Sequence, residues 1–207
     1  MSKNYLYIPL ALSALAAINP AQADVSINGL EAVKLFGDMR MRFERTDGDT
    51  IDTTSRARLR ARFGIKYEVN EDWSGVMRFR TTSGAHDSTH QTFGISDTSD
   101  NDDFGLDKAY MTYKGIENTK IVIGKASPVF MHSSELLFRD DIALEGVQGN
   151  WTKGPLSVNA GHIILEENKD NGEGKRDASW QQLQAVYSGQ LSELKFKLGL
   201  GGIFVSA

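Results

Sequence analysis

Residues 56–69 of the chain read Arg-Ala-Arg-Leu-Arg-Ala-Arg-Phe-Gly-Ile-Lys-Tyr-Glu-Val. Arginine occupies every even position from Arg56 to Arg62, and small, apolar or aromatic residues occupy the odd positions through Val69. An amphipathic helix would instead place its apolar residues three and four positions apart. The alternation therefore predicts a β-strand with one apolar face and one cationic face.

The cationic face of this strand restricts what the strand can touch. A lipid-facing arginine near the bilayer midplane costs roughly 2–4 kcal/mol, and an unpaired charge in a dry protein core costs more. Arginines two positions apart lie about 7 Å from each other and repel by roughly 2 kcal/mol at an effective dielectric of about 20. The face must therefore meet water, mobile anions or fixed carboxylates. An ordinary surface hairpin with a solvated charged face would meet the same requirement.

The first residues have the pattern of an export signal. Lys3 precedes an apolar run over residues 6–18, and Ala21-Gln22-Ala23 is a small-x-small cleavage site. We expect residues 1–23 to be a signal peptide and the mature protein to begin at Asp24. The apolar run is too short for a transmembrane helix. The chain contains no cysteine, which is common among exported proteins of the Gram-negative outer membrane.

The charges of the chain are sorted along the sequence. The formal net charge is only −4, but Arg and Lys gather in the alternating segments, whereas Asp and Glu gather between them, as in residues 46–52, 97–107 and 166–177. The segregation therefore carries more information than the net charge. The absence of a long apolar segment excludes a helical membrane protein but not a transmembrane β-barrel, whose strands hide their apolar residues in alternation.

Alternation of period two continues through most of the chain. We expect about nine strands, at residues 35–45, 56–69, 73–80, 107–114, 120–125, 142–151, 156–165, 180–187 and 194–202. Short turns and long polar connections alternate between them, beginning with a long connection at residues 46–55, and aromatic residues such as Trp73 and Tyr113 lie near strand ends. This combination predicts an all-β, antiparallel transmembrane β-barrel domain over residues 24–207, with short periplasmic turns and long external loops.

An odd number of strands does not suit a complete bacterial barrel. Bacterial single-chain barrels use even counts, and an open sheet edge is not tolerated in lipid. We therefore expect the chain to be a truncated or N-terminal-half member of a larger barrel, incomplete at the C-terminus.

Several stretches resemble the bacterial putative porin family of outer-membrane β-barrels, which is similar in style to phosphate-selective porins and alginate-export barrels. Residues 37–44, Gly-Asp-Met-Arg-Met-Arg-Phe-Glu, resemble that family's opening strand, and residues 56–63 resemble its arginine-rich second strand. Further similar stretches are residues 70–75, 88–94, 106–110, 124–125 and 144–146, with His90 standing where the family would have Asn. The resemblance implies a sixteen-stranded passive channel, usually about twice this length, that catalyses no reaction.

The candidate functional surface is the inward-facing cationic row. It comprises Arg40, Arg42, Arg56, Arg58, Arg60, Arg62, Arg78, Arg80 and Lys108. Rings of Arg or Lys in a pore favour anions, and arginine offers planar, bidentate contacts to phosphate or carboxylate. Two hypotheses stay open: the row meets mobile anions in a water-filled lumen, or fixed acids such as Asp38, Glu44 and Glu68, or an inward-folded loop, pair with it.

No motif indicates catalysis or a cofactor. The acidic residues of 97–107 lack the spacing of an EF-hand loop, and a solvated loop is the simpler interpretation. The four histidines are scattered without the spacing of a zinc site. No Ser is singled out by its spacing from a His. We expect no catalytic residue, no metal site and no cofactor.

The sequence as a whole predicts an outer-membrane porin of a Gram-negative bacterium, for passive diffusion of small hydrophilic solutes with a preference for anions. Its partners would be outer-membrane lipid and small anionic or polar solutes. A homotrimer is expected by analogy with porins, and nucleic acid is not expected as a partner. The main alternative is an exported β-sheet protein that binds acidic polysaccharide or phosphate, which would bury Phe63 and Met77 in a core. An outer-membrane enzyme is a third interpretation.

Overall fold

The computed structural model describes residues 21–27, 30–48, 51–82, 90–93, 103–131, 142–167 and 177–206, which form eleven β-strands. The strands are β1 Ala21–Ile27, β2 Leu30–Gly48, β3 Ile51–Glu68, β4 Trp73–Thr82, β5 Gln91–Thr92, β6 Asp103–Tyr113, β7 Thr119–Ala126, β8 Leu144–Lys153, β9 Leu156–Glu166, β10 Ala178–Leu191 and β11 Leu194–Ser206. The described residues include no helix of the length and apolarity needed to cross a membrane.

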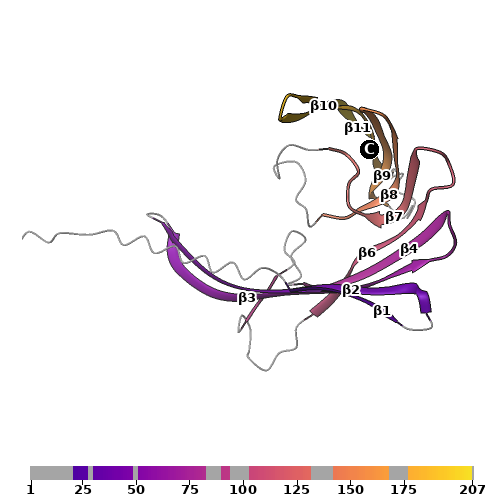
Figure 1. The fold of residues 1–207 in the computed structure, drawn as a ribbon. Coiled ribbons are helices and arrows are strands. Elements are labelled where there is room, and N and C mark those ends of the chain that lie inside the picture. The colour runs from indigo at the N-terminus through magenta and orange to yellow at the C-terminus, as the bar shows by residue number, and fades with distance from the viewer. Residues whose placement is uncertain are drawn as a thin grey trace, which may run out of the picture.

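The strands form a single antiparallel sheet in which neighbours in the chain are neighbours in space. The order is β1-β2-β3-β4-β6-β7-β8-β9-β10-β11, and the short β5 pairs with β3 outside this path. The sheet curves from β1–β3 through β7 to β10 and β11, so that its two ends face each other across a concave side (Figure 1). The prediction of an all-β antiparallel fold is confirmed. Closure into a sixteen-stranded barrel stays a prediction.

All nine predicted strands are present, and the prediction of about nine omits β1 and β5. β1 begins at Ala21, three residues ahead of the expected mature start at Asp24. Residues 1–20 lie outside the described residues, so the signal peptide also stays a prediction.

The prediction of a long connection at residues 46–55 is wrong. β2 and β3 continue as a two-stranded ribbon in which Thr46 lies opposite Thr54 and Gly48 lies opposite Ile51. Figure 1 shows this ribbon extending beyond the end of β4. Its polar sequence has no alternating apolar residues, so the alternation that located the other strands could not reveal it.

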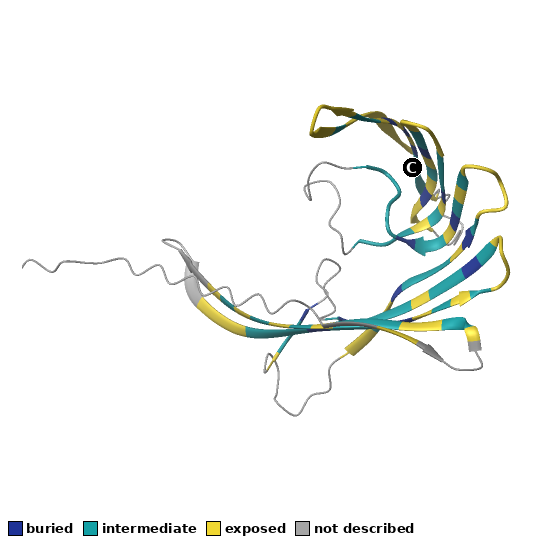
Figure 2. Ribbon diagram, in the orientation of Figure 1, coloured by how far each residue is buried: buried dark blue, intermediate teal, exposed yellow. Residues whose placement is uncertain are grey.

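The two faces of the sheet differ in chemistry. Large apolar side chains of β3 and β4 point away from the concave side and stay exposed, with Phe63 at 53% and Met77 at 49% exposure. Buried and exposed residues alternate in the middle of β10, and the strands are mostly intermediate or exposed elsewhere (Figure 2). Among the described residues, ten polar or charged residues are buried against only four apolar ones, Val122, Ala126, Ile163 and Val186. In a water-soluble protein the buried residues are mainly apolar. Burial of polar residues with exposed apolar ones is typical of a sheet whose outer face contacts lipid.

The soluble-sandwich alternative requires a second sheet over the apolar face. The described strands belong to one sheet, and none of them covers Phe63 or Met77 on that face. The structure therefore favours the transmembrane interpretation over the sandwich.

A pair of glycines permits close strand packing where the sheet bends near β7 and β8 (Figure 1). Gly124 and Gly146 lie opposite each other, with φ angles of +116° and +152°. A Cβ atom at Gly146 would lie 2.1 Å from the carbonyl oxygen of His162, and one at Gly124 would lie 2.4 Å from that of Ala109. Backbone atoms cannot yield to such contacts, so only glycine fits at these two positions.

If the convex face contacts lipid, a charge placed there should destabilise the protein. We predict that Met77→Arg lowers the free energy of unfolding in lipid vesicles by roughly 2–4 kcal/mol, because a guanidinium must then enter hydrocarbon. The control Met77→Leu conserves volume and apolarity and should change it by less than about 1.5 kcal/mol. Denaturant unfolding followed by tryptophan fluorescence measures both, and equal stabilities of the two variants would place Met77 in water.

Candidate functional site

The alternation of β2, β3, β4 and β6 brings all nine predicted site residues to the concave face. We call this set the cationic face: Arg40, Arg42, Arg56, Arg58, Arg60, Arg62, Arg78, Arg80 and Lys108. The register places these residues side by side in the pairs Arg40–Arg60, Arg42–Arg58, Arg62–Arg80 and Arg78–Lys108. Like charges directly opposite each other across a sheet are destabilising, so the face requires carboxylates or solvent anions.

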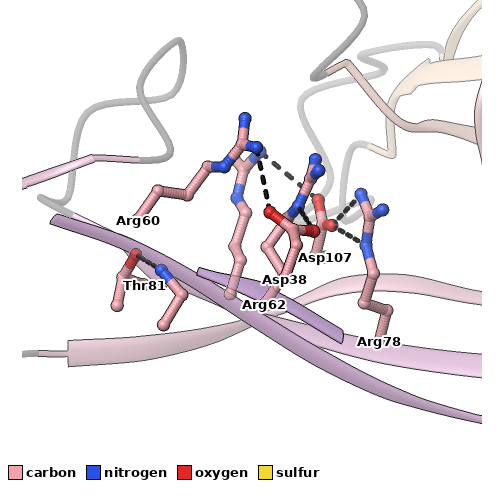
Figure 3. Close-up of polar contacts among 8 residues, drawn as sticks. Asp38, Arg60, Arg62, Arg78, Thr81 and Asp107 are labelled. Carbon is pink, nitrogen blue, oxygen red and sulfur yellow. Dashed lines mark hydrogen bonds and ion pairs between the residues drawn. The ribbon is translucent and has the colours of Figure 1, made fainter. Parts of the chain in front are cut away.

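Asp38 neutralises part of the cationic face at the β2–β3 ladder. Arg60 Nη2 donates to Asp38 Oδ1 at 2.9 Å, and Arg62 Nε donates to Asp38 Oδ2 at 2.6 Å (Figure 3). The Asp38 side chain is only 10% exposed. Both of its oxygens accept charge-assisted hydrogen bonds, which are stronger than neutral ones and hold the two guanidinium groups in place.

Glu44 neutralises a second part of the cationic face, farther along β2. Its Oε2 accepts a hydrogen bond from Arg56 Nε at 2.7 Å and pairs with Arg58 Nη1 at 3.5 Å, while Arg42 pairs with Oε1. Glu68, the third acid considered from the sequence, pairs with Lys66 instead of an arginine of the cationic face. Fixed carboxylates therefore neutralise part of the positive charge of the cationic face.

Asp107 also lies on the cationic face, although the alternation of β6 does not predict it there. Continued alternation from Lys108 would point Asp107 toward lipid. A register shift opposite Arg78 and Phe79 lets Lys108 pair with Arg78 and Leu106 pair with Phe79, so that Asp107 has no partner of its own in the ladder. This β-bulge turns Asp107 to the concave face.

On the concave face, Asp107 forms ion pairs with two arginines of β4. Its side chain is 1% exposed, Arg78 donates to Oδ2, and Arg80 Nη1 pairs with Oδ1 at 3.3 Å (Figure 3). Period-two analysis assumes an unbroken phase, so it could not find this residue. The only signal was an acidic residue in a position that would otherwise face lipid.

The remaining two members of the cationic face have different surroundings. Lys108 Nζ donates to Ser127 Oγ. Arg40 forms no ion pair with any carboxylate in the part of the chain that the structure describes.

A second polar cluster lies on β8, β9 and β10, and sequence reasoning missed it. It consists of Gln148, Asn150, Asn159, Gln182 and Gln184, which we name the amide cluster. Asn159 Nδ2 donates to Gln184 Oε1 at 3.0 Å, and Asn150 Nδ2 donates to Asn159 Oδ1 at 2.7 Å. Buried amides of this kind require such partners, because an unsatisfied polar group is costly.

The amide cluster anchors the segment that follows β7, residues 127–131. Gln184 Oε1 accepts from the Met131 amide at 2.7 Å, and Gln184 Nε2 donates to the Met131 carbonyl oxygen at 2.8 Å. The Val129 amide donates to Gln148 Oε1 at 3.0 Å. The side-chain amides thus form hydrogen bonds with the backbone of this segment, as a neighbouring strand would, and they hold it against the concave face.

His90 lies over the cationic face beside β5. The carbonyl oxygen of His90 accepts a hydrogen bond from Arg58 Nη2 at 3.3 Å, and the Phe93 amide donates to the Ala57 carbonyl oxygen at 3.0 Å. His90 is only 7% exposed. Burial, followed by the positive charges of Arg42, Arg58, Arg60 and Arg40, lowers its pKa from 6.5 to about 4. The imidazole is therefore neutral at physiological pH.

No metal centre emerges from the described residues, in which no three His, Cys, Asp or Glu side chains gather. Residues 97–102 of the acidic stretch considered for calcium lie outside the described part of the chain. Its last member, Asp107, binds arginines instead.

A comparison with known families decides the identity of this sheet. The model of the family described as "Putative porin" matches residues 47–159, more than half of the chain. The chain belongs to this porin family. No curated protein matches the chain.

Membership gives the chain a porin-like role. Porins are channels rather than enzymes and are outer-membrane proteins, so the family supports a non-enzymatic role at that membrane. The matched region runs from the end of β2 into β9, and it contains most of the cationic face and part of the amide cluster. Arg40 and Arg42 lie before the match.

The depressed pKa of His90 predicts an acid-sensitive attachment of the β5 segment in this porin. The detached segment, with a histidine pKa near 6.5, binds a proton more readily than the attached one. The free energy that neutral His90 contributes to attachment of the segment is therefore fully present above about pH 6.5. It is lost as the pH falls toward about 4. Among the described residues, the charged groups facing the imidazole are Arg40 and Arg42 of β2 and Arg58 and Arg60 of β3.

Hydrogen exchange of the Phe93 amide measures this attachment. Its protection, corrected for the intrinsic exchange rate, should be lower at about pH 5 than at about pH 7 in the wild type. In His90→Gln, which cannot titrate, the protection should be the same at both values. An equal change in the two proteins would show that His90 does not control the segment.

Proposed function

We propose that the protein forms a passive diffusion channel for small hydrophilic solutes, with a preference for anions. The observation that carries this proposal is the concentration of positive side chains on the cationic face. Nine cationic side chains gather there, and among the described residues the carboxylates that pair with them are Asp38, Glu44 and Asp107. A concave surface of one sign raises the local concentration of the opposite ion.

Ion pairing and anion preference are compatible on this face. The three carboxylates hold guanidinium groups in position, while the positive side chains of the face attract anions from the lumen. Removing a partner from a buried pair costs about 3–5 kcal/mol, so the acids contribute to folding. Arg40 forms no ion pair with a carboxylate of the described residues, and in this proposal mobile anions offset its charge.

The zero-current potential across a planar bilayer under a KCl gradient tests the proposal. We expect the whole gene product to give an anion-signed potential. Arg58→Gln combined with Arg60→Gln removes two positive charges from the cationic face and should move the potential toward zero.

A matched double variant controls for net charge. Lys195→Gln with Lys197→Gln removes the same two charges from exposed positions on β11, away from the cationic face, and should shift the potential less. A cation-signed wild-type potential would contradict the proposal. Equal shifts in the two double variants would remove the cationic face as the source of selectivity.

A further inference from the structure

An open groove crosses the convex face of the sheet between β3 and β7. It has a volume of about 440 Å³, and its lining includes Tyr67, Gly75, Met77, Ala109, Met111 and Ile123. Gly75 and Ala109 are small, whereas the apolar side chains beside them are large and exposed. The groove therefore arises because two small residues lie between large apolar ones. An apolar groove on a lipid-facing surface fits a hydrocarbon chain.

A charged pair lies beside this groove on the same face. Ala109 lies directly opposite Lys125 of β7, and Lys125 Nζ donates to Glu145 Oε1 of β8 at 2.8 Å. Val122 is buried and Ile123 is 43% exposed, so alternation places Lys125 with Ile123 on the convex face. A lysine ammonium group has three N–H donors. Among the described residues, Lys125 uses one of them, and Glu145 Oε2 accepts no hydrogen bond.

β7 is too short to place this pair beyond the bilayer. Lys125 lies six positions after Thr119, the first residue of β7. At about 3.3 Å per residue and a tilt of about 40°, that is a rise of roughly 15 Å, whereas the apolar band of a transmembrane barrel is about 25 Å tall. Charged groups at that depth require a polar partner, because hydrocarbon offers no hydrogen bonds. A lipid headgroup held at the pair would supply one.

Neutral polar side chains continue from the pair across β9 and β10. His162 of β9 lies opposite Val147, two positions from Glu145 on the same face of the ladder. Gln181 Nε2 lies 3.2 Å from His162 Nδ1 and donates to Ser179 Oγ at 3.3 Å. The row from β7 to β10 spans three strand spacings, about 14 Å, which is wider than one phosphate group. Hydrogen-bonding side chains over that width match the hydroxyl groups of sugars.

We infer that this part of the convex face is a binding site for a phosphorylated glycolipid. Lys125 binds the phosphate through its two remaining N–H donors. Glu145 and the row from His162 to Ser179 meet sugar hydroxyl groups. An acyl chain occupies the groove. The inference rests on a lipid-facing convex surface and not on the ion preference of the lumen.

The direction of the site fits a lipid of the outer leaflet. Lys125 lies one position before the end of β7, beside the long connection to β8, and long connections are expected on the outside. Gly75, at the other end of the groove, is the third residue of β4 and lies near the short turn that follows β3. The headgroup would thus lie toward the outside and the acyl chain toward the periplasm.

Native mass spectrometry of the whole gene product, released from detergent, tests the site with lipid A as the probe. We expect one retained lipid A per chain, along a saturating curve. Phosphatidylethanolamine, which has a phosphate and acyl chains but no sugar, should be retained less. Equal retention of the two lipids, or no saturable adduct, would overturn the site. A second copy of the chain in place of lipid would assign the groove to a subunit contact and would also overturn it.

Gly75→Leu fills the groove, and Gly202→Leu is its matched control. A Cβ atom at Gly75 would lie 3.0 Å from Met111 Sδ, in a flexible side chain that can move aside. Gly202 lies opposite Leu183 on β11, and a Cβ atom there would meet nothing within 4 Å. Gly75→Leu should weaken lipid A retention by roughly tenfold, through exclusion of about two methylene groups, and Gly202→Leu should leave it unchanged. Equal effects would remove the groove from the site.

The combined variant Lys125→Gln, Glu145→Gln removes both charges but keeps groups that can hydrogen-bond to each other. It should weaken lipid A retention by roughly tenfold, through loss of the charge-assisted contact with phosphate. Lys66→Gln with Glu68→Gln removes another Lys–Glu ion pair, on β3, and should leave retention unchanged. Equal weakening would overturn the site. An anion-signed channel that retains no lipid A refutes only this inference, whereas a cation-signed channel that retains it refutes only the proposed function.

Discussion

A row of like charges on one face of β3 is the constraint on which the rest of the structure depends. Four arginines at alternate positions cannot enter hydrocarbon, because each would cost roughly 2–4 kcal/mol at the midplane. The row therefore fixes which face of β3 is concave and wet, and hydrogen bonding extends that assignment to the neighbouring strands. The opposite face then carries exposed apolar side chains such as Phe63 and Met77.

The concave face divides into two chemically different parts on either side of the bend at Gly124 and Gly146. The cationic face lies on β2, β3, β4 and β6, and the amide cluster lies on β8, β9 and β10. Charge is concentrated on the first part, whereas the second part is neutral and anchors residues 127–131 through Gln148 and Gln184.

Periodicity predicted the strands and their faces because both depend on side-chain alternation, which the sequence displays directly. Asp107 could not be predicted, because a β-bulge changes the phase of β6 and depends on pairing with β4. The ribbon at Thr46 and Thr54 was missed because its polar residues have no apolar face. The role of Gln184 was missed because its partner, Met131, is 53 positions away in the chain.

The most direct test of the account is a cysteine scan of β3, which is unambiguous because the chain contains no cysteine. Positions 56–63 would be replaced one at a time, and each variant would be treated in lipid vesicles with a water-soluble, membrane-impermeant thiol reagent. The account predicts labelling with period two: even positions such as Arg58 and Arg62 react, and odd positions such as Phe63 react only after the lipid is removed. Equal labelling of odd and even positions in intact vesicles would contradict a wet cationic face opposite a lipid-facing apolar one.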